Sequence, residues 1–227
     1  MKVVKQLERW GGVVTDGHFV YTSDKHGPAY INFDVGFTHP KFLWQVCRAL
    51  IKPYKGKFDV IVAPATGGVA LAAITWVYAW MFWAKKVKFV WADKGDDKQF
   101  VFERAGFAKT VKGRRVLVVD DIMTNANPQG SVYKLCRLVE ASGGKVVGVS
   151  IVVNRCGGTA EDLEVPRLSQ LDTVDSSLFY ALTPSECDHN KDGLCKQNVP
   201  IVDDVGHGAE YKAGHPDYKG GYVSLLS

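Results

Sequence analysis

Residues 115–128 read RVLVVDDIMTNANP, and this stretch decides the fold. It predicts a buried strand that ends on Asp120 and Asp121 and continues through a short polar loop into a helix. In an open α/β sheet, the carboxyl ends of strands and the N-termini of helices form the usual ligand crevice. Buried adjacent acids need partners, so we expect these two to face hydroxyl groups or a cation.

Apolar strands and helices alternate on both sides of this stretch. The pattern predicts helices at residues 1–10, 40–51, 69–84 and 129–142, strands at 59–63, 87–91, 116–119 and 146–153, and a short hairpin within 19–34. Continuous apolar strands between helices indicate an open, twisted parallel sheet with helices on both faces. The highly charged residues 93–112 predict a mobile loop.

The composition excludes several classes of protein. The chain has 227 residues, 46% of them hydrophobic, which suits one α/β domain with an elaboration and argues against disorder. A net charge of +4 suits a phosphorylated small molecule and is too weak to indicate nucleic-acid binding. The five cysteines are scattered and odd in number, and the N-terminus lacks an apolar signal-peptide core, so we expect reduced thiols in a cytoplasmic protein.

One uncharged segment, residues 69–84, imitates a membrane span and carries five aromatic side chains: Trp76, Tyr78, Trp80, Phe82 and Trp83. It is shorter than the ~20 apolar residues that a spanning helix needs. It also follows a Gly-Gly turn directly after a strand. We therefore expect a helix of the core or of a subunit interface, and its aromatic density favours the interface.

Four motifs, in order along the chain, resemble orotate phosphoribosyltransferases, members of the type I phosphoribosyltransferase family. Residues 115–128 are similar to the family's phosphoribosyl diphosphate signature, and residues 17–30 (GHFVYTSDKHGPAY) resemble its N-terminal segment. Residues 63–68 (APATGG) resemble its pyrophosphate loop, and Asn154-Arg155 stands where the family has Asp-Arg. The ordered set, from about Gly11 to Ile201, is specific although each motif alone is moderate.

The resemblance implies a fold and a reaction. It implies the type I phosphoribosyltransferase fold over residues 1–183, including a small N-terminal hood, and an irregular C-terminal tail over 184–227. It implies a glycosyltransferase of the pentosyltransferase class in pyrimidine biosynthesis, in which orotate and phosphoribosyl diphosphate give orotidine 5′-monophosphate and pyrophosphate with Mg²⁺. Family members act as homodimers with shared active sites, which we therefore expect here.

The chemistry explains why two acids stand together. Cleavage at the ribose C1 atom creates an oxocarbenium-like centre and an anionic leaving group, so catalysis consists of placing charge and excluding water. Asp120 and Asp121 would hold the ribose hydroxyls, directly or through the metal, and offset the positive charge. The structural alternative is a strand-end acid that caps the next turn, but capping needs one acid and not two.

The phosphate loop departs from the family pattern. Backbone N–H groups of Thr124, Asn125, Ala126 and Asn127 would cradle the 5′-phosphate, although an ordinary strand-to-helix turn is the alternative. The family usually has Thr-Thr-Gly-x-Ser, so Ala126 replaces a flexible glycine and Pro128 removes an N–H and a hydroxyl. The asparagines restore polar groups that tolerate a left-handed backbone.

The remaining expected site residues also come from the resemblance. Thr66, Gly67 and Gly68 would approach the pyrophosphate through main-chain amides, and Lys94 would reach it from the charged loop; a plain tight turn and a solvated lysine are the alternatives. Arg155 would pair with the orotate carboxylate, since a planar fork of donors suits that anion, and a surface ion pair is the alternative. The expected orotate-binding residues are Thr124, Arg155, Lys25 and Tyr30.

The tail contains possible metal ligands outside this site. Cys187 and Cys195, with His189, His207 and His215, are candidates for zinc, but the cysteine spacing is wider than the Cys-x-x-Cys of close relatives. We therefore expect an irregular surface segment and no dedicated metal residue there. His18 and His26 are expected to orient the N-terminal hairpin.

Two other functions stay open. The altered loop at 124–128 is compatible with a non-catalytic member of the fold that binds a nucleotide or ribose phosphate. A phosphoribosyltransferase for another base would keep the acids but leave Arg155 and residues 19–30 unexplained. A P-loop NTPase is disfavoured because no G-x-x-x-x-G-K-[ST] motif occurs.

Overall fold

The computed structural model describes residues 2–21, 24–65, 67–83, 86–95, 99–175 and 177–225. The chain forms two compact units. Unit 1 comprises residues 1–6 and 33–173, and unit 2 comprises residues 7–32 and 174–227, so the boundary expected at 183/184 falls inside unit 2. The first helix, α1 (Val3–Arg9), passes from unit 1 into unit 2.

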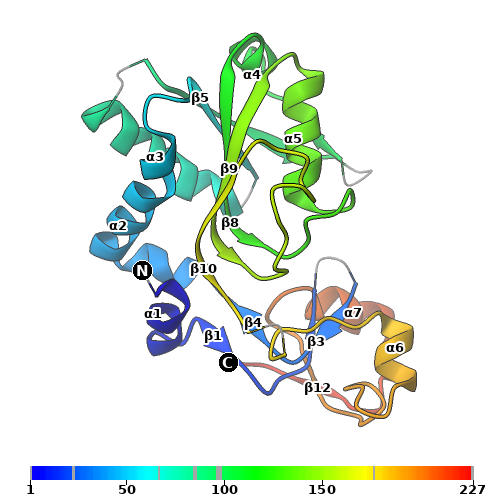
Figure 1. Cartoon of the computed structure of the whole chain (residues 1–227). Coiled ribbons are helices and arrows are strands. Elements are labelled where there is room, and N and C mark those ends of the chain that lie inside the picture. Colours follow the sequence, from blue (N-terminus) through cyan, green and yellow to red (C-terminus); the bar gives the residue numbers. More distant parts are fainter. Residues whose placement is uncertain are drawn as a thin grey trace. The chain divides into compact units, whose positions relative to one another are not determined.

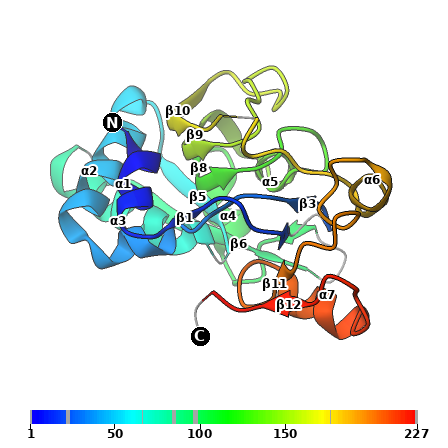
Figure 2. The same cartoon turned by 90° about the horizontal axis from the view of Figure 1, so that it is seen from below.

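Unit 1 is built on a six-stranded sheet of order β10-β9-β8-β5-β6-β7, and Figure 2 shows β10, β9, β8, β5 and β6 in this order. Its strands are β5 (Val60–Pro64), β6 (Lys88–Lys94), β7 (Phe100–Val101), β8 (Arg115–Met123), β9 (Lys145–Asn154) and β10 (Leu168–Thr173). All neighbouring strands pair in parallel except β6 and β7, which are antiparallel. The expected parallel sheet is thus confirmed, with a short antiparallel strand at one edge.

Helices cover both faces of this sheet (Figure 1). Helices α2 (Pro40–Ile51) and α3 (Gly67–Phe82) pack together on one face, and α4 (Phe107–Val111) and α5 (Ser131–Ala141) pack on the other. Helix α2 begins with Pro40 in its first turn, where the missing N–H costs nothing. Helix α5 ends in a Schellman motif, in which Gly143 adopts a φ of 77° that favours glycine. Two 3₁₀ turns, η1 (Asp34–Thr38) and η2 (Lys52–Tyr54), flank α2.

Alternation along the strands produces the core. Val60, Val62, Val116 and Val118 are buried in one cluster with the α5 residues Val132, Leu135, Cys136 and Val139. The residues between them, including Ile61 and Leu117, are fully buried on the other face of the strands. Burial on both faces explains why these strands are continuously apolar in sequence.

Two sequence expectations need correction in unit 1. Strand β8 does not stop before the acids: it continues to Met123, because its partner β9 also continues and pairs Met123 with Asn154. The charged residues 93–112 are not simply a mobile loop, since they include the end of β6, strand β7 and helix α4. Among the described residues, no helix is both long and apolar enough to cross a membrane.

Unit 2 consists of short elements from both ends of the chain. Two antiparallel pairs, β1 (Val13–Val14) with β4 (Tyr30–Ile31) and β2 (Phe19–Val20) with β3 (His26–Gly27), form the N-terminal part. The C-terminal part contains α6 (Pro184–His189), β11 (Ile201–Val202), α7 (Gly208–Gly214) and β12 (Tyr222–Val223). The two parts are joined by a bridge between His26 and Leu182. Residues 184–227 are therefore not a free tail within this unit.

Candidate active site

The parallel strands β5, β6, β8 and β9 bring their carboxyl ends to one edge of the sheet. Pro64 ends β5, Lys94 ends β6, Met123 ends β8 and Asn154 ends β9. The residues that follow these ends are the segments expected to bind substrate. A single edge therefore collects Gly67, Gly68, Lys94, the acid pair, the loop after Met123, and Arg155.

Asp120 and Asp121 occupy adjacent positions in the last part of β8. Asp120 is buried, with 6% of its surface exposed, and Asp121 is half-buried. Asp120 Oδ1 accepts a hydrogen bond from the backbone N–H of Asp121 at 2.9 Å, and Asp121 Oδ1 accepts one from the N–H of Ile122 at 2.7 Å. Each carboxylate thus has one oxygen fixed by the backbone, which orients the pair.

Burial disfavours the charged form of both acids, and the charge of Asp121 adds to this effect at Asp120. Burial, followed by the charge of Asp121, raises the pKa of Asp120 well above its ordinary range. Burial also raises the pKa of Asp121, and the charge of Asp34 adds to that rise. Asp34 stands at the start of η1, and no local pattern in the sequence relates it to Asp121, because it lies in a 3₁₀ turn far away along the chain. A cation or hydroxyl donors would stabilise this concentration of negative charge.

The N-terminus of α3 lies directly against the acids. A β-carbon added to Gly68 would stand 3.1 Å from Asp120 Oδ1 and 2.8 Å from the Pro64 ring. A β-carbon added to Gly67 would stand 3.4 Å from Asp121 Oδ2. Glycine is needed at 68 because of this close approach. The structure therefore brings together two of the expected site segments, while Thr66 lies outside the described residues.

Two asparagine side chains form hydrogen bonds to backbone N–H groups of the loop that follows β8. Asn125 Oδ1 accepts from the N–H of Asn127 at 2.9 Å, and Asn127 Oδ1 accepts from the N–H of Gln129 at 2.9 Å. Thr124 is exposed and Ala126 is buried. One amide of the expected phosphate cradle, that of Asn127, is thus engaged by a side chain of the loop itself.

A hollow of about 350 Å³ adjoins this loop. It is lined by the loop residues 125–128 together with Cys156, Gly158 and Asp162. A β-carbon on Gly158 would come within 2.3 Å of the Ala126 β-carbon, so the loop after β9 packs tightly on the loop after β8. The hollow therefore lies on the expected phosphate side of the site.

The other expected residues are placed as follows. Arg155 follows β9 directly, and its N–H donates to the Met123 carbonyl at 2.9 Å, which sets it beside Thr124. Lys94 is exposed and pairs with Phe100 across β6 and β7. Lys25 and Tyr30 belong to unit 2, where Lys25 is exposed and Tyr30 stacks on Phe19 with ring centroids 5.6 Å apart.

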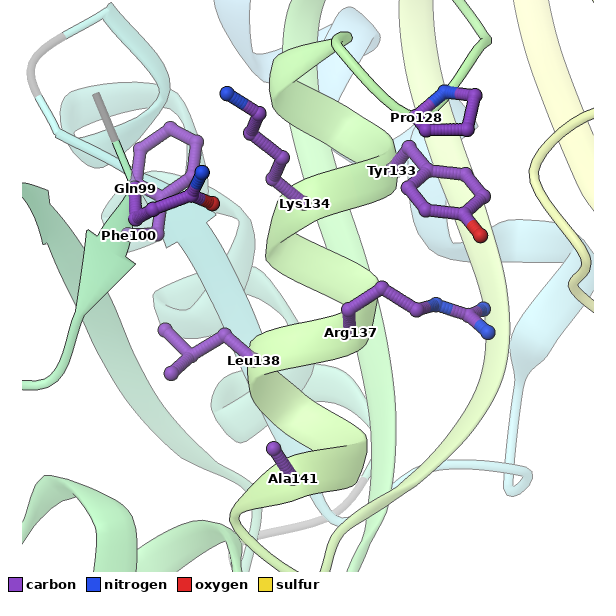
Figure 3. Close-up of a pocket in the computed structure, with 8 residues that line it drawn as sticks. All are labelled: Gln99, Phe100, Pro128, Tyr133, Lys134, Arg137, Leu138 and Ala141. Atoms are coloured by element: carbon purple, nitrogen blue, oxygen red, sulfur yellow. The ribbon is translucent and has the colours of Figure 1, made fainter. Parts of the chain in front are cut away.

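A second hollow, of about 320 Å³, contains none of the expected site residues. Figure 3 shows it along the outer side of α5, where Lys134, Leu138 and Ala141 face Gln99 and Phe100. It lacks the acids and the helix N-terminus that characterise the carboxyl edge. We therefore assign the site to the carboxyl edge.

Comparison with known proteins identifies the family. The family model of the phosphoribosyl transferase domain matches residues 38–184. The orotate phosphoribosyltransferase of Caldanaerobacter subterraneus subsp. tengcongensis is 31% identical over 205 residues, covering 89% of this chain and 93% of that protein. The chain belongs to the orotate phosphoribosyltransferase family. A second orotate phosphoribosyltransferase, from a Thermoanaerobacter species, is 34% identical over 192 residues, covering 84% of this chain and 90% of that protein.

A solved structure supports the fold of this family member. The crystal structure of orotate phosphoribosyltransferase from Aeropyrum pernix superposes with a TM-score of 0.55 at 22% identity, covering 75% of this chain and 93% of that one. At this identity the likeness concerns the fold alone. The type I phosphoribosyltransferase fold expected from the motifs is confirmed.

Proposed function

We propose that this orotate phosphoribosyltransferase family member transfers the phosphoribosyl group of phosphoribosyl diphosphate to orotate, giving orotidine 5′-monophosphate and pyrophosphate. The observation that carries the proposal is the pair of acids at the carboxyl edge, of which Asp120 is buried and Asp121 is half-buried. Both acids lie against the glycines that begin α3. Such an arrangement offers two negative charges next to backbone amides. It suits a sugar that turns cationic between two phosphate groups.

The acids act by position and charge. They would accept hydrogen bonds from the ribose 2- and 3-hydroxyls, and their charge would offset the cationic character that develops at C1. Because burial raises the pKa values of both acids, the charged pair is stabilised when substrate supplies donors or positive charge. The charged acids therefore complement the cationic transition state better than the neutral sugar of the ground state.

The acid pair also fits Mg²⁺. Carboxylate oxygens are the ligands that this hard cation prefers, and Asp120, Asp121 and Asp34 concentrate negative charge whose mutual repulsion a cation relieves. We propose that Asp120 and Asp121 hold Mg²⁺ together with the diphosphate sugar. When bound, the ion neutralises charge on the leaving pyrophosphate.

Backbone amides and two basic side chains would hold the anionic groups. Residues 124–127 are proposed to bind the 5′-phosphate, and Thr66, Gly67 and Gly68 the pyrophosphate, since amides at a helix N-terminus attract anions. Lys94 is proposed to reach the pyrophosphate. Arg155 is proposed to pair with the orotate carboxylate beside Thr124, with Lys25 and Tyr30 as further orotate contacts.

Turnover of orotate tests this function. Orotate absorbance should fall only when both phosphoribosyl diphosphate and Mg²⁺ are present. A matched set of bases, with uracil, adenine and hypoxanthine in place of orotate, tests selectivity in the same assay. Absence of turnover with every base at saturating diphosphate sugar would contradict the proposal, and turnover with another base alone would reassign the substrate.

One observation favours a second function, a non-catalytic protein that binds a nucleotide or ribose phosphate. Asn125 Oδ1 engages the N–H of Asn127, an amide that the 5′-phosphate would otherwise use. This arrangement weakens the grip on the sugar relative to a free amide cradle. Calorimetry separates the two functions, because a non-catalytic protein binds phosphoribosyl diphosphate or orotidine 5′-monophosphate and leaves both unchanged after incubation with orotate.

We further propose a cytoplasmic homodimer with shared active sites. Five apolar side chains from α2 and α3 are between 37% and 56% exposed: Trp44, Val77, Trp80, Met81 and Phe82, here called the α2–α3 apolar face. Clustered exposed aromatic residues typify protein interfaces, and a second copy of the chain is the proposed occupant. Five free cysteines suit a reducing compartment.

A further inference from the structure

Four metal-ligating side chains meet inside unit 2, outside the proposed active site. They are His18, His26, Cys187 and Cys195, and one ligand atom from each lies within 4.8 Å of all the others. Both histidines and Cys187 are fully buried, and Cys195 is 8% exposed. Buried polar side chains of this kind require a common partner or a network. The group contains none of His189, His207 and His215, which the sequence analysis had paired with the cysteines.

The distances within this group are close to those of a tetrahedron around one ion. His18 Nε2 lies 2.9 Å from His26 Nδ1, 3.8 Å from Cys187 Sγ and 3.7 Å from Cys195 Sγ, and Cys195 Sγ lies 3.2 Å from His26 Nδ1. Zinc bonds of about 2.0–2.1 Å to nitrogen and about 2.3 Å to sulfur give tetrahedral edges of about 3.3–3.8 Å. The separations of 3.7 and 3.8 Å fall within this range and those of 2.9 and 3.2 Å are shorter, so the ligand atoms would move slightly apart around a central ion.

Local structure explains how two cysteines eight residues apart converge. Cys187 lies in α6, whose first turn is fixed by a capping box between Thr183 and Glu186. The chain then folds back through Gly193, where a β-carbon would stand 2.0 Å from the Cys187 carbonyl oxygen. This turn lets the N–H of Cys195 donate to Cys187 Sγ at 3.2 Å. The wide cysteine spacing thus does not argue against a shared ligand.

A second layer of contacts orients the histidines. His18 Nδ1 donates to the Val199 carbonyl at 2.9 Å, so the lone pair of this neutral imidazole is on Nε2, which faces the group. The Tyr218 hydroxyl donates to the same carbonyl at 2.9 Å.

We propose that His18, His26, Cys187 and Cys195 form a structural zinc site. Four protein ligands fill a tetrahedral shell, which is typical of structural and not of catalytic zinc. When Zn²⁺ binds, each of the two thiols releases its proton to solvent. The two thiolates then neutralise the charge of the ion, which would be costly to bury without compensation. The ion would join His18 and His26 to Cys187 and Cys195 and so close a long loop of the chain that includes residues 33–173 of unit 1.

Metal analysis of the whole chain, purified without a histidine tag or chelators, tests this site. We expect about one zinc per chain for the wild type, and a fall to about one-tenth or less in Cys195→Ser and in His26→Gln. Cys156→Ser and His189→Gln are matched controls, because both side chains are exposed and outside the group; they should keep the full zinc content.

A second measurement uses only the wild-type protein, so that its result does not depend on whether the variants fold. After zinc in the wild type is exchanged for Co²⁺, we expect the visible bands of tetrahedral cobalt and a thiolate charge-transfer band. Two results would overturn the site: a folded wild type without zinc or cobalt bands that has five reactive thiols on unfolding, or a disulfide between Cys187 and Cys195. Equal zinc content in all four variants would overturn it as well.

Discussion

Gly68 and Asp120 are in such close contact that a β-carbon on the glycine would stand 3.1 Å from Asp120 Oδ1. This relationship joins the start of α3 to the acid pair of β8. It means that the amides proposed to bind pyrophosphate and the carboxylates proposed to bind ribose hold a fixed mutual position. Preorganisation of this kind lowers the cost of aligning a flexible diphosphate sugar.

The first prediction concerns this contact. Gly68→Ala would place a β-carbon 2.8 Å from the Pro64 ring as well, so α3 or Asp120 must shift. Overpacking of this kind costs about 1–3 kcal/mol, and we expect a KM for phosphoribosyl diphosphate raised by about tenfold. Gly67→Ala meets only an ordinary contact at 3.4 Å, and Gly214→Ala meets nothing within 4 Å, so both should stay near wild type. An unchanged KM in Gly68→Ala would refute the prediction.

The second prediction concerns catalysis by the acids. Asp121→Asn keeps the shape of the side chain and removes the charge that would offset the cationic transition state. We expect kcat to fall by about 100-fold or more, similar to the loss of one preorganised electrostatic group elsewhere. Asp59→Asn is the matched control, because Asp59 pairs with Arg115 at the opposite end of the sheet. Full activity of Asp121→Asn in the orotate absorbance assay would exclude Asp121 from the site.

The third prediction follows from the sign of the pKa shift. Burial raises the pKa of Asp120, so between its ordinary value of 3.8 and the raised value the folded state binds more protons than the unfolded state. Stability should therefore fall as the pH rises through that window. Asp120→Asn should abolish much of the fall and raise Tm at neutral pH, by about 2–4 °C for each ~1 kcal/mol. The measurement is thermal unfolding against pH without divalent cations, and a lower Tm for the variant at pH 7 would contradict it.

Periodicity predicted most of unit 1 because the relevant forces are local. Residues 40–51 were predicted as a helix and form α2, and the apolar runs around Val62, Val118 and Val149 form neighbouring parallel strands. A polar pair directly after an apolar run predicts that the strand ends on Asp120 and Asp121. Strand β8 instead continues past both acids to Met123, because its length depends on pairing with β9, which is distant along the chain.

Contacts between distant segments account for what the sequence could not predict. Asp34 influences Asp121 across the fold, and no local pattern marks an acid in a 3₁₀ turn as part of a site. The group of His18, His26, Cys187 and Cys195 joins segments about 170 residues apart. Among the histidines, the sequence offered only His189, His207 and His215 as candidate partners of these cysteines, and no metal residue was expected there. The bridge between His26 and Leu182 brings His26 close to the segment that carries Cys187 and Cys195.

The fourth prediction concerns the phosphate loop. Asn125→Ala removes the side-chain oxygen that engages the Asn127 N–H, so phosphate no longer competes for this amide. A neutral hydrogen bond is worth about 0.5–1.5 kcal/mol, and we therefore expect the KM for phosphoribosyl diphosphate to fall by about 2–10-fold. The KM for orotate should not change, which provides an internal control. A higher KM for the diphosphate sugar would show that the asparagine itself contacts the phosphate.

The fifth prediction concerns the α2–α3 apolar face. Trp80 belongs to this face and is 47% exposed, so Trp80→Lys places a charge where a second copy of the chain would exclude water. We expect the wild type to sediment as a dimer and Trp80→Lys to sediment as a folded monomer at micromolar concentration. Leu178→Lys is the control: Leu178 is 53% exposed and belongs to unit 2, not to α2 or α3. A monomeric wild type would refute the dimer, and dissociation by Leu178→Lys instead of Trp80→Lys would move its interface.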